Sequence, residues 1–194
     1  MKKTFIIEHL EQRLGKWCIL EYKHISKIVE KNNLIFTNVI NKKDKNKLAK
    51  FGKVIQQSVR ELKLQNACVL DPEAKTTLIP KIAKRYSYFI FGGILGDFPP
   101  RRRTKKELTR FINAKPYNIG KEQMPTDNAI AVVNEIISGR PLSKMKFKDT
   151  IEVIKDNNKG IQESYVLPYR YLIKDKKPLI SKQVVVYLKK KKGF

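Results

Sequence analysis

Blocks of apolar and polar residues alternate along the first 140 residues, which indicates strands alternating with helices. Apolar runs of strand length predict strands over Thr4–Glu8, Asn33–Val39, Ala67–Leu70, Tyr86–Phe91 and Lys115–Ile119. Apolar residues at helical spacing predict helices over Gly15–Glu30, Lys47–Leu62, Thr104–Ile112 and Thr126–Ser138. The polar segment Asn41–Lys47 is either a loop or a helix start, and Gly52 weakens the helix after it. Such alternation predicts an α/β fold with a mainly parallel sheet.

The pattern changes after Pro141, where apolar and polar residues alternate singly. This alternation predicts antiparallel strands over Lys146–Ile154, Ser164–Ile173 and Gln183–Leu188, separated by turns at Asp156–Gly160 and Lys174–Pro178. The chain therefore divides into a domain over residues 1–140 and a β-rich C-terminal extension over residues 141–194. The extension ends in the basic run Lys189–Lys192.

Three loops follow predicted strands and are the first candidates for a ligand site. In parallel sheets the ligand lies beyond the carboxyl ends of the strands. We therefore expect the loops Leu70–Ala74, Gly92–Arg103 and Ile119–Asp127 to meet there.

The segment Phe91–Thr104 is the most informative of these, because three glycines occur within five positions. Glycine allows positive φ and a close approach of backbone to a ligand, so backbone groups here can bind an adenosine or its ribose. The segment lacks the ending of a phosphate loop and the spacing of a dinucleotide fingerprint. A structural turn would explain Gly92 and Gly93, but not Gly96, Asp97 and the arginine triplet that follows.

The other two loops carry weaker signals. Asn118–Ala129 runs through a glycine into a helix N-terminus, where the small Ala129 leaves room, but an ordinary capped helix explains it equally well. Asp71-Pro72 after a strand is by itself usually a turn.

Charge is the strongest signal in the composition. The 42 Lys and Arg residues outnumber the 18 Asp and Glu residues, which gives a net charge of +24. Such a charge favours a polyanionic partner, above all RNA, and exceeds what solubility requires. The alternative is a lysine-rich proteome in which lysine simply fills solvated surfaces.

Cysteine and histidine usage points to no metal site and no disulfide framework. Cys18 and Cys68 lie among apolar neighbours, and two histidines cannot bind a metal alone. No apolar run approaches the length of a membrane span, and the apolar stretch at the N-terminus is too short for a signal peptide. We therefore expect a cytoplasmic protein without a membrane partner.

The motifs taken together resemble one branch of the SPOUT methyltransferases. This branch was formerly described as predicted RNA methyltransferases, and it includes a eukaryotic arginine methyltransferase that acts on a ribosomal protein. The segments that carry the resemblance are Ile7–Glu11, Trp17–Tyr22, Leu70–Ala74, Phe91–Thr104, Gln123–Ile130 and Leu167–Tyr171. They occur in the family's order, and the glycine-proline-arginine segment is long and specific.

The resemblance implies a SPOUT fold, with helices on both faces of the sheet and a deep trefoil knot on its C-terminal side. It also implies that S-adenosylmethionine binds against the loops of the knot. The cofactor-binding residues that follow are Leu70, Asp71, Pro72, Phe91, Gly92, Gly93, Ile94, Leu95, Gly96, Ile119, Gly120, Met124, Thr126 and Ala129. On this basis Gly93→Val is expected to abolish cofactor binding with little effect on the fold. A homodimer and a monomer are both compatible with the resemblance.

An arginine acceptor would need a carboxylate, because its guanidinium begins protonated. Asp97 is the first catalytic candidate, because it follows the glycines directly. Glu8 and Glu21 come next, and Tyr22 could orient the acceptor. For each carboxylate, a salt bridge to one of the many basic residues is the alternative.

Basic residues near the predicted site are candidates for binding the substrate. Arg101, Arg103 and Lys105 form a cluster beside the glycine segment, and Arg170 belongs to the matched motif of the extension. They could hold phosphates of RNA, whereas Arg103 could instead brace the knot.

The sequence thus predicts an S-adenosylmethionine-dependent methyltransferase acting on a component of the translation machinery. Its substrate is either RNA, ribosomal or transfer, or an arginine of a ribosomal protein within a ribonucleoprotein. The alternative is a non-catalytic basic protein that binds RNA or assists ribosome assembly, which would not bind S-adenosylmethionine.

Overall fold

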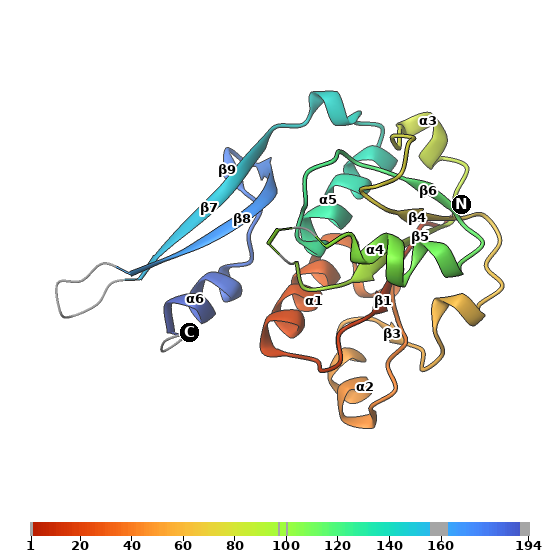
Figure 1. Ribbon diagram of the computed structural model, residues 1–194, viewed down its shortest axis with the longest axis horizontal. Coiled ribbons are helices and arrows are strands. Elements are labelled where there is room, and N and C mark those ends of the chain that lie inside the picture. Colours follow the sequence, from red (N-terminus) through yellow and green to blue (C-terminus); the bar gives the residue numbers. More distant parts are fainter. Residues whose placement is uncertain (1, 97, 100, 156–162, 191–194) are drawn as a thin grey trace.

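The computed structural model describes residues 2–96, 98–99, 101–155 and 163–190. A parallel sheet of six strands in the order β3-β2-β1-β5-β4-β6 forms its centre (Figure 1). The strands are β1 (Thr4–His9), β2 (Leu34–Thr37), β3 (Lys53–Val54), β4 (Ala67–Leu70), β5 (Tyr88–Gly93) and β6 (Lys115–Tyr117). The predicted parallel sheet is therefore confirmed.

The larger core lies between one face of the sheet and helices α1 (Lys16–Val29) and α5 (Thr126–Ile137). Side chains of α1 at helical spacing, including Cys18, Tyr22 and Ile25, are buried in it. The shorter helices α2 (Lys42–Leu48) and α3 (Pro80–Ala83) also contribute buried side chains to this core.

Shorter elements cover the opposite face of the sheet. They are η2 (Val59–Glu61), α4 (Arg103–Glu107) and η3 (Thr109–Phe111). Ile6, Val69 and Ile90 of the central strands pack there against Val59 and Leu108. Side chains alternate between the two faces along each strand. Apolar side chains therefore lie on both faces of this parallel sheet, and other elements must pack on each face to bury them. The expected helices on both faces are present.

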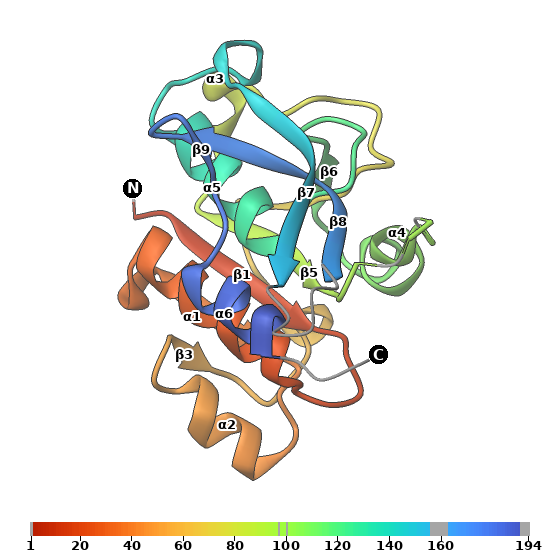
Figure 2. The ribbon, with the colours of Figure 1, turned by 90° about the vertical axis from the view of Figure 1, so that its left-hand side faces the viewer.

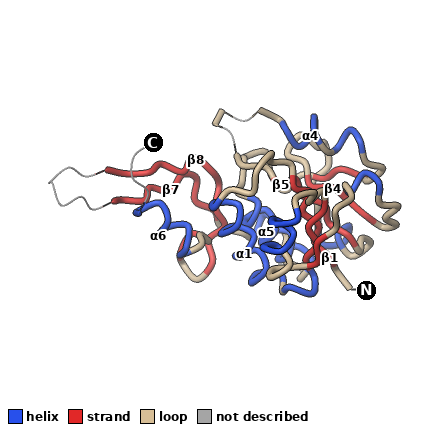
Figure 3. The backbone as a smooth tube through the Cα atoms, turned by 90° about the horizontal axis from the view of Figure 1, so that it is seen from below, coloured by secondary structure: helices blue, strands red, loops and turns tan. Residues whose placement is uncertain are grey.

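The chain beyond η4 (Leu142–Lys144) forms a second, antiparallel sheet (Figure 2). It consists of β7 (Phe147–Lys155), β8 (Glu163–Lys174) and the short β9 (Lys177–Pro178). Helix α6 (Lys182–Lys190) follows and packs against β7 and α1, as Figures 2 and 3 show. The β-rich extension is thus confirmed, apart from its last predicted strand.

The prediction of a strand over Gln183–Leu188 was wrong, because these residues lie within helix α6. Three consecutive valines favour a strand by propensity. Val184 and Leu188, four residues apart, are instead buried in a cluster that contains Trp17 and Leu20 of α1. Burial of this helical stripe outweighs the local preference.

The prediction of a helix over Lys47–Leu62 was also wrong. Asn41 caps α2 early by accepting bonds from the backbone N–H groups of Lys43 and Asp44, and the helix ends at Leu48. Gly52 then packs so closely on β2 that an added Cβ would lie 2.7 Å from the carbonyl oxygen of Leu34. The chain continues as β3 and η2, so an edge strand replaces the predicted helix.

The loops that follow β4 and β6 are tied together by Asn118. Its backbone N–H donates to the Thr76 carbonyl at 2.9 Å, and its carbonyl accepts from the Leu78 N–H at 2.9 Å. Its side-chain amide donates to the Ala74 carbonyl at 2.8 Å. These bonds fix the path by which the chain enters α5.

None of the helices formed by the described residues combines the length and apolarity of a membrane span.

Candidate functional site

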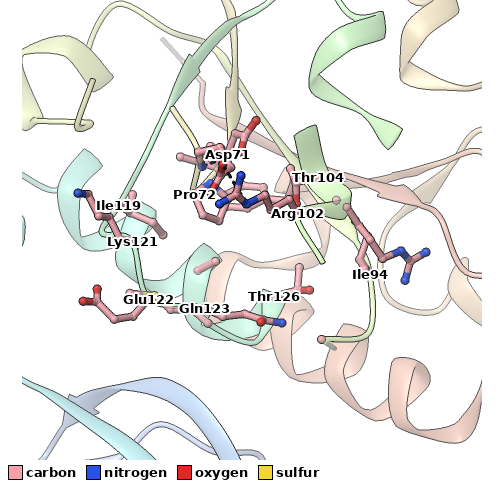
Figure 4. Close-up of a pocket in the computed structure, with 18 of the residues that line it drawn as sticks. Asp71, Pro72, Ile94, Arg102, Thr104, Ile119, Lys121, Glu122, Gln123 and Thr126 are labelled. Atoms are coloured by element: carbon pink, nitrogen blue, oxygen red, sulfur yellow. Dashed lines mark hydrogen bonds and ion pairs between the residues drawn. The ribbon is translucent and has the colours of Figure 1, made fainter. Parts of the chain in front are cut away.

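A cleft of about 170 Å³ lies at the carboxyl ends of β4, β5 and β6, where the three predicted loops meet. Figure 4 shows the Asp71-Pro72 turn and Arg102 on one side and the segment Lys121–Gln123 on the other. The structure therefore brings together these predicted residues: Leu70, Asp71, Pro72, Phe91, Gly92, Ile94, Gly96, Ile119, Gly120, Met124, Thr126 and Ala129. Their contact with a cofactor stays a prediction.

Gly93 and Leu95 do not line the cleft. Gly93 ends β5 and faces the core, where an added Cβ would lie 2.4 Å from the Tyr22 hydroxyl oxygen. The substitution Gly93→Val would therefore disrupt packing between β5 and α1, so the expectation of an intact fold was wrong. Leu95 uses its backbone N–H, which donates to Glu11 at 2.9 Å.

The glycines of the segment Phe91–Thr104 let the backbone lie close to neighbouring side chains, and they do not adopt positive φ. Among the described glycines only Gly120 and Gly139 have positive φ. An added Cβ on Gly96 would lie 2.6 Å from the Gln123 amide nitrogen and 2.8 Å from the Tyr169 ring. The Gly96 carbonyl accepts a bond from the Tyr169 hydroxyl at 2.7 Å, so the loop is held against β8.

Gln123 lines the cleft and carries a buried acceptor oxygen. This side-chain oxygen has no hydrogen-bond partner among the described residues. A buried acceptor left without a donor costs about 1–3 kcal/mol.

The carboxylates that border the cleft already have partners. Asp71 is buried, and it accepts bonds from the Thr109 hydroxyl at 2.7 Å and from the Glu73 N–H at 2.9 Å. Asp71 therefore shapes the first loop. Glu73 pairs with Arg102 at 3.4 Å, and this pair stays partly exposed.

The catalytic candidate Glu8 lies away from the cleft, on the side of η2. It is fully buried and accepts bonds from the hydroxyls of Thr37 and Ser58 and from the Val59 N–H at 2.9 Å. These bonds anchor η2 to β1. This geometry favours a structural role for Glu8.

Glu21 and Tyr22 are buried beneath the cleft. Glu21 accepts a long bond of 3.4 Å from the Asp127 N–H, at the start of α5. Burial, and then the nearby Asp127 carboxylate, raise the pKa of Glu21 to about 8. The Tyr22 hydroxyl shares a hydrogen bond with His9 at 3.1 Å, and burial raises its pKa. Neither side chain lines the cleft.

Asp97, the first catalytic candidate, lies outside the described residues. The flanking residues Gly96 and Arg101 both line the cleft. Asp97 therefore keeps its place as a candidate by position in the chain.

The predicted substrate-binding residues separate into two kinds. Arg103 pairs with Glu11 at 2.8 Å and Glu107 at 2.7 Å, which braces the glycine segment. Arg170 pairs with Asp149 at 2.7 Å and Glu122 at 2.6 Å, which joins the extension to the third loop. Arg101 and Lys105 are exposed and form no ion pair within the described part of the chain.

Several residues that line the cleft were not selected from the sequence. They are Glu73, Arg102, Thr104, Lys121, Glu122 and Gln123. All lie in the loops that the sequence identified, but residue spacing in a loop does not reveal which side chains point inward.

Comparisons with known proteins give the family. The family described as protein arginine N-methyltransferase SFM1-like matches residues 4–193. Protein arginine N-methyltransferase SFM1 of Saccharomyces cerevisiae is 35% identical over 204 residues, which cover 96% of this chain and 94% of the yeast protein.

Solved structures agree with this result. The crystal structure of yeast arginine methyltransferase SFM1 complexed with SAM has a TM-score of 0.86 at 33% identity, covering 98% of this chain and 91% of the yeast chain. Its complex with SAH has a TM-score of 0.83 at 32% identity, covering 95% and 94%. Dual specific Trm10 from Thermococcus kodakaraensis has a TM-score of 0.59 at 19% identity, covering 73% and 96%, and shows the fold alone.

The fold and these comparisons define a methyltransferase of the SPOUT class. The predicted SPOUT fold is confirmed, and S-adenosylmethionine is the cofactor. The chain belongs to the SFM1-like family of protein arginine N-methyltransferases. Membership in this family favours a methyltransferase over the alternative of a non-catalytic RNA-binding or ribosome-assembly protein.

Proposed function

We propose that this protein transfers the methyl group of S-adenosylmethionine to an arginine of a protein in the translation machinery. One observation carries the proposal: the cleft at the three loops lies within a chain matched almost end to end by a yeast protein arginine N-methyltransferase. The partner we propose is a ribosomal protein within a cytoplasmic ribonucleoprotein, and RNA is the alternative acceptor.

The side chains of the cleft suit a nucleoside that carries a sulfonium group. Leu70, Ile119 and Met124 supply apolar surface for an adenine ring, and Ala129 leaves space at the first turn of α5. Gln123 lines the same cleft, and its buried side-chain oxygen has no partner among the described residues. S-adenosylmethionine, once bound, supplies a methyl group on a positively charged sulfur.

Positioning is the main task of the protein in such a transfer, and it can contribute about 7–11 kcal/mol. The Arg103 ion pairs and the Tyr169 hydroxyl hold the glycine loop in place. The acceptor guanidinium must also lose a proton, because its pKa lies above about 12. We propose that Asp97 orients this group and takes the proton.

The variant Asp97→Asn tests this role. We expect kcat to fall by about 100-fold or more, because a general base typically contributes about 10²–10⁴-fold. The affinity for S-adenosylhomocysteine, measured by calorimetry, should change little. Asp44→Asn on the remote helix α2 is the control and should keep full activity. Normal kcat in Asp97→Asn would exclude this role.

The acceptor is identified by incubating the enzyme with methyl-labelled S-adenosylmethionine and ribosomes from cells that lack the gene. We expect label that resists ribonuclease, is released by protease and is recovered as methylarginine. Label that disappears with ribonuclease would make RNA the acceptor.

Size-exclusion chromatography with light scattering would distinguish a monomer from a homodimer.

A further inference from the structure

A second hollow of about 350 Å³ lies on the face of the sheet that carries η2, α4 and η3. It is lined by Ile90 of β5 and by residues 59–60, 62–65, 67 and 112–114. It shares no residue with the methyltransferase cleft. The proposed methyl transfer gives this hollow no role.

An aromatic ring and a guanidinium lie together beside this hollow: Arg60 lines it, and Phe111 precedes the lining residue Ile112 in the chain. Phe111 is 56% exposed, so its ring is accessible to a ligand. The guanidinium of Arg60 lies over its ring, 4.4 Å from the ring centroid. Arg60 also donates to the Glu107 carbonyl, which holds it in this position. The pair forms a platform that carries positive charge.

Unpaired positive charge lies in the chain segments that carry the platform. Lys63, Lys105, Lys106 and Arg110 are exposed, and none forms an ion pair within the residues that the structure describes. The acidic side chains nearby are engaged: Glu61 accepts from the Ser58 N–H, and Glu107 binds Arg103. The cations here outnumber these two carboxylates, of which Glu61 is exposed and Glu107 is paired with Arg103.

The hollow and the cleft border the same segment of chain. Arg101–Thr104 line the cleft, and the chain continues through α4 and η3 to residues 112–114 at the hollow. The exposed cations Arg101, Lys105, Lys106 and Arg110 lie along this segment. They can bind successive phosphates of one strand that runs from the hollow toward the cleft.

We propose that this surface binds single-stranded RNA. A base would stack on Phe111 and Arg60, while the lysines and Arg110 would bind the backbone. Stacking on an aromatic ring and a guanidinium within a positive groove is how proteins bind unpaired strands. An acidic peptide could use the charges, but it would leave the platform without a stacking partner. The inference builds on the proposed function, because the RNA would belong to the particle that presents the acceptor protein.

Fluorescence anisotropy with a labelled oligouridine of about 12 nucleotides tests the proposal without catalysis. We expect Phe111→Ala to weaken binding at least about fivefold, and Phe111→Tyr, which keeps an aromatic ring, to retain the affinity. Arg110→Glu should weaken binding and make the log–log salt dependence shallower by about 0.7. Lys45→Glu on α2, with the same change of charge on an exposed residue, is the matched control and should bind normally.

Three outcomes would overturn the proposal. Equal losses in Arg110→Glu and Lys45→Glu would mean diffuse charge, and equal binding by the Ala and Tyr variants of residue 111 would exclude stacking. Competition by polyglutamate as strong as that by unlabelled oligouridine would indicate an acidic peptide. Calorimetry with S-adenosylhomocysteine runs in parallel, so a failed methyltransferase assignment stays distinguishable from a failed RNA site.

Discussion

Glu21 is a carboxyl group that the fold holds mainly in its neutral form near pH 7. It is buried between α1 and the start of α5, close to the Asp127 carboxylate. Both surroundings disfavour a second negative charge, and the pKa rises from 4.5 to about 8. Asp127 has partners of its own: it pairs with His24 at 2.7 Å and accepts from the Asn128 N–H at 2.8 Å.

Glu21→Gln should remove a pH dependence of stability. Between pH 4.5 and about 8 the folded wild type keeps a proton that the unfolded chain has lost, so its stability falls as the pH rises through this window. Glutamine keeps the acceptor oxygen but does not titrate. We expect the variant to gain stability relative to wild type with rising pH, by on the order of a few kcal/mol at most.

The measurement is urea unfolding at a series of pH values. Glu152→Gln, at an exposed position on β7, is the control and should follow the wild-type profile. Parallel profiles for wild type and Glu21→Gln would show that Glu21 is ionised in the folded protein at neutral pH.

At the scale of elements, the C-terminal extension is joined to the domain by a buried amide. Asn128 on α5 accepts from the Leu172 N–H at 2.8 Å and donates to the Leu179 carbonyl at 2.9 Å. Its side chain is fully buried. One residue therefore satisfies backbone groups on both sides of the β8–β9 hairpin.

Asn128→Ala should loosen this joint. The Leu172 N–H and the Leu179 carbonyl would lose their partners, which we expect to cost about 2–4 kcal/mol of unfolding free energy. Urea unfolding gives the total, and hydrogen exchange should show faster exchange at Leu172. Asn134→Ala, on the same helix and half-buried, is the control. A loss no larger than that of the control would mean that apolar packing alone holds the extension.

Elements were predicted best where the pattern was long and amphipathic. The stripes of α1 and α5 specify these helices locally. Short elements depended on contacts elsewhere in the chain: α2 ended early and β3 formed because Gly52 fits against β2. Helix α6 formed because α1 and the hairpin offer an apolar surface to Val184 and Leu188.

At the scale of the whole molecule, a net charge of +24 must repel itself. Raising sodium chloride from about 10 mM to about 100 mM shortens the screening length from about 30 Å to about 10 Å. We expect the melting temperature to rise across this range, as calorimetry would measure. Sodium acetate at equal ionic strength is the control for specific anion binding. A flat or falling melting temperature would contradict self-repulsion.

The sequence alone determined the parallel α/β sheet, the three loops and, through their motifs, the family. Periodicity and order along the chain encode these features directly. Only the tertiary structure decided which of the candidate residues face the cleft. It turned Gly93 toward the core, used Glu8 to accept hydrogen bonds that hold η2, and used Arg103 and Arg170 in ion pairs that brace the loops. It also paired Arg60 with Phe111. The direction of a side chain, and which residue pairs with which, depend on contacts between distant segments that periodicity does not record.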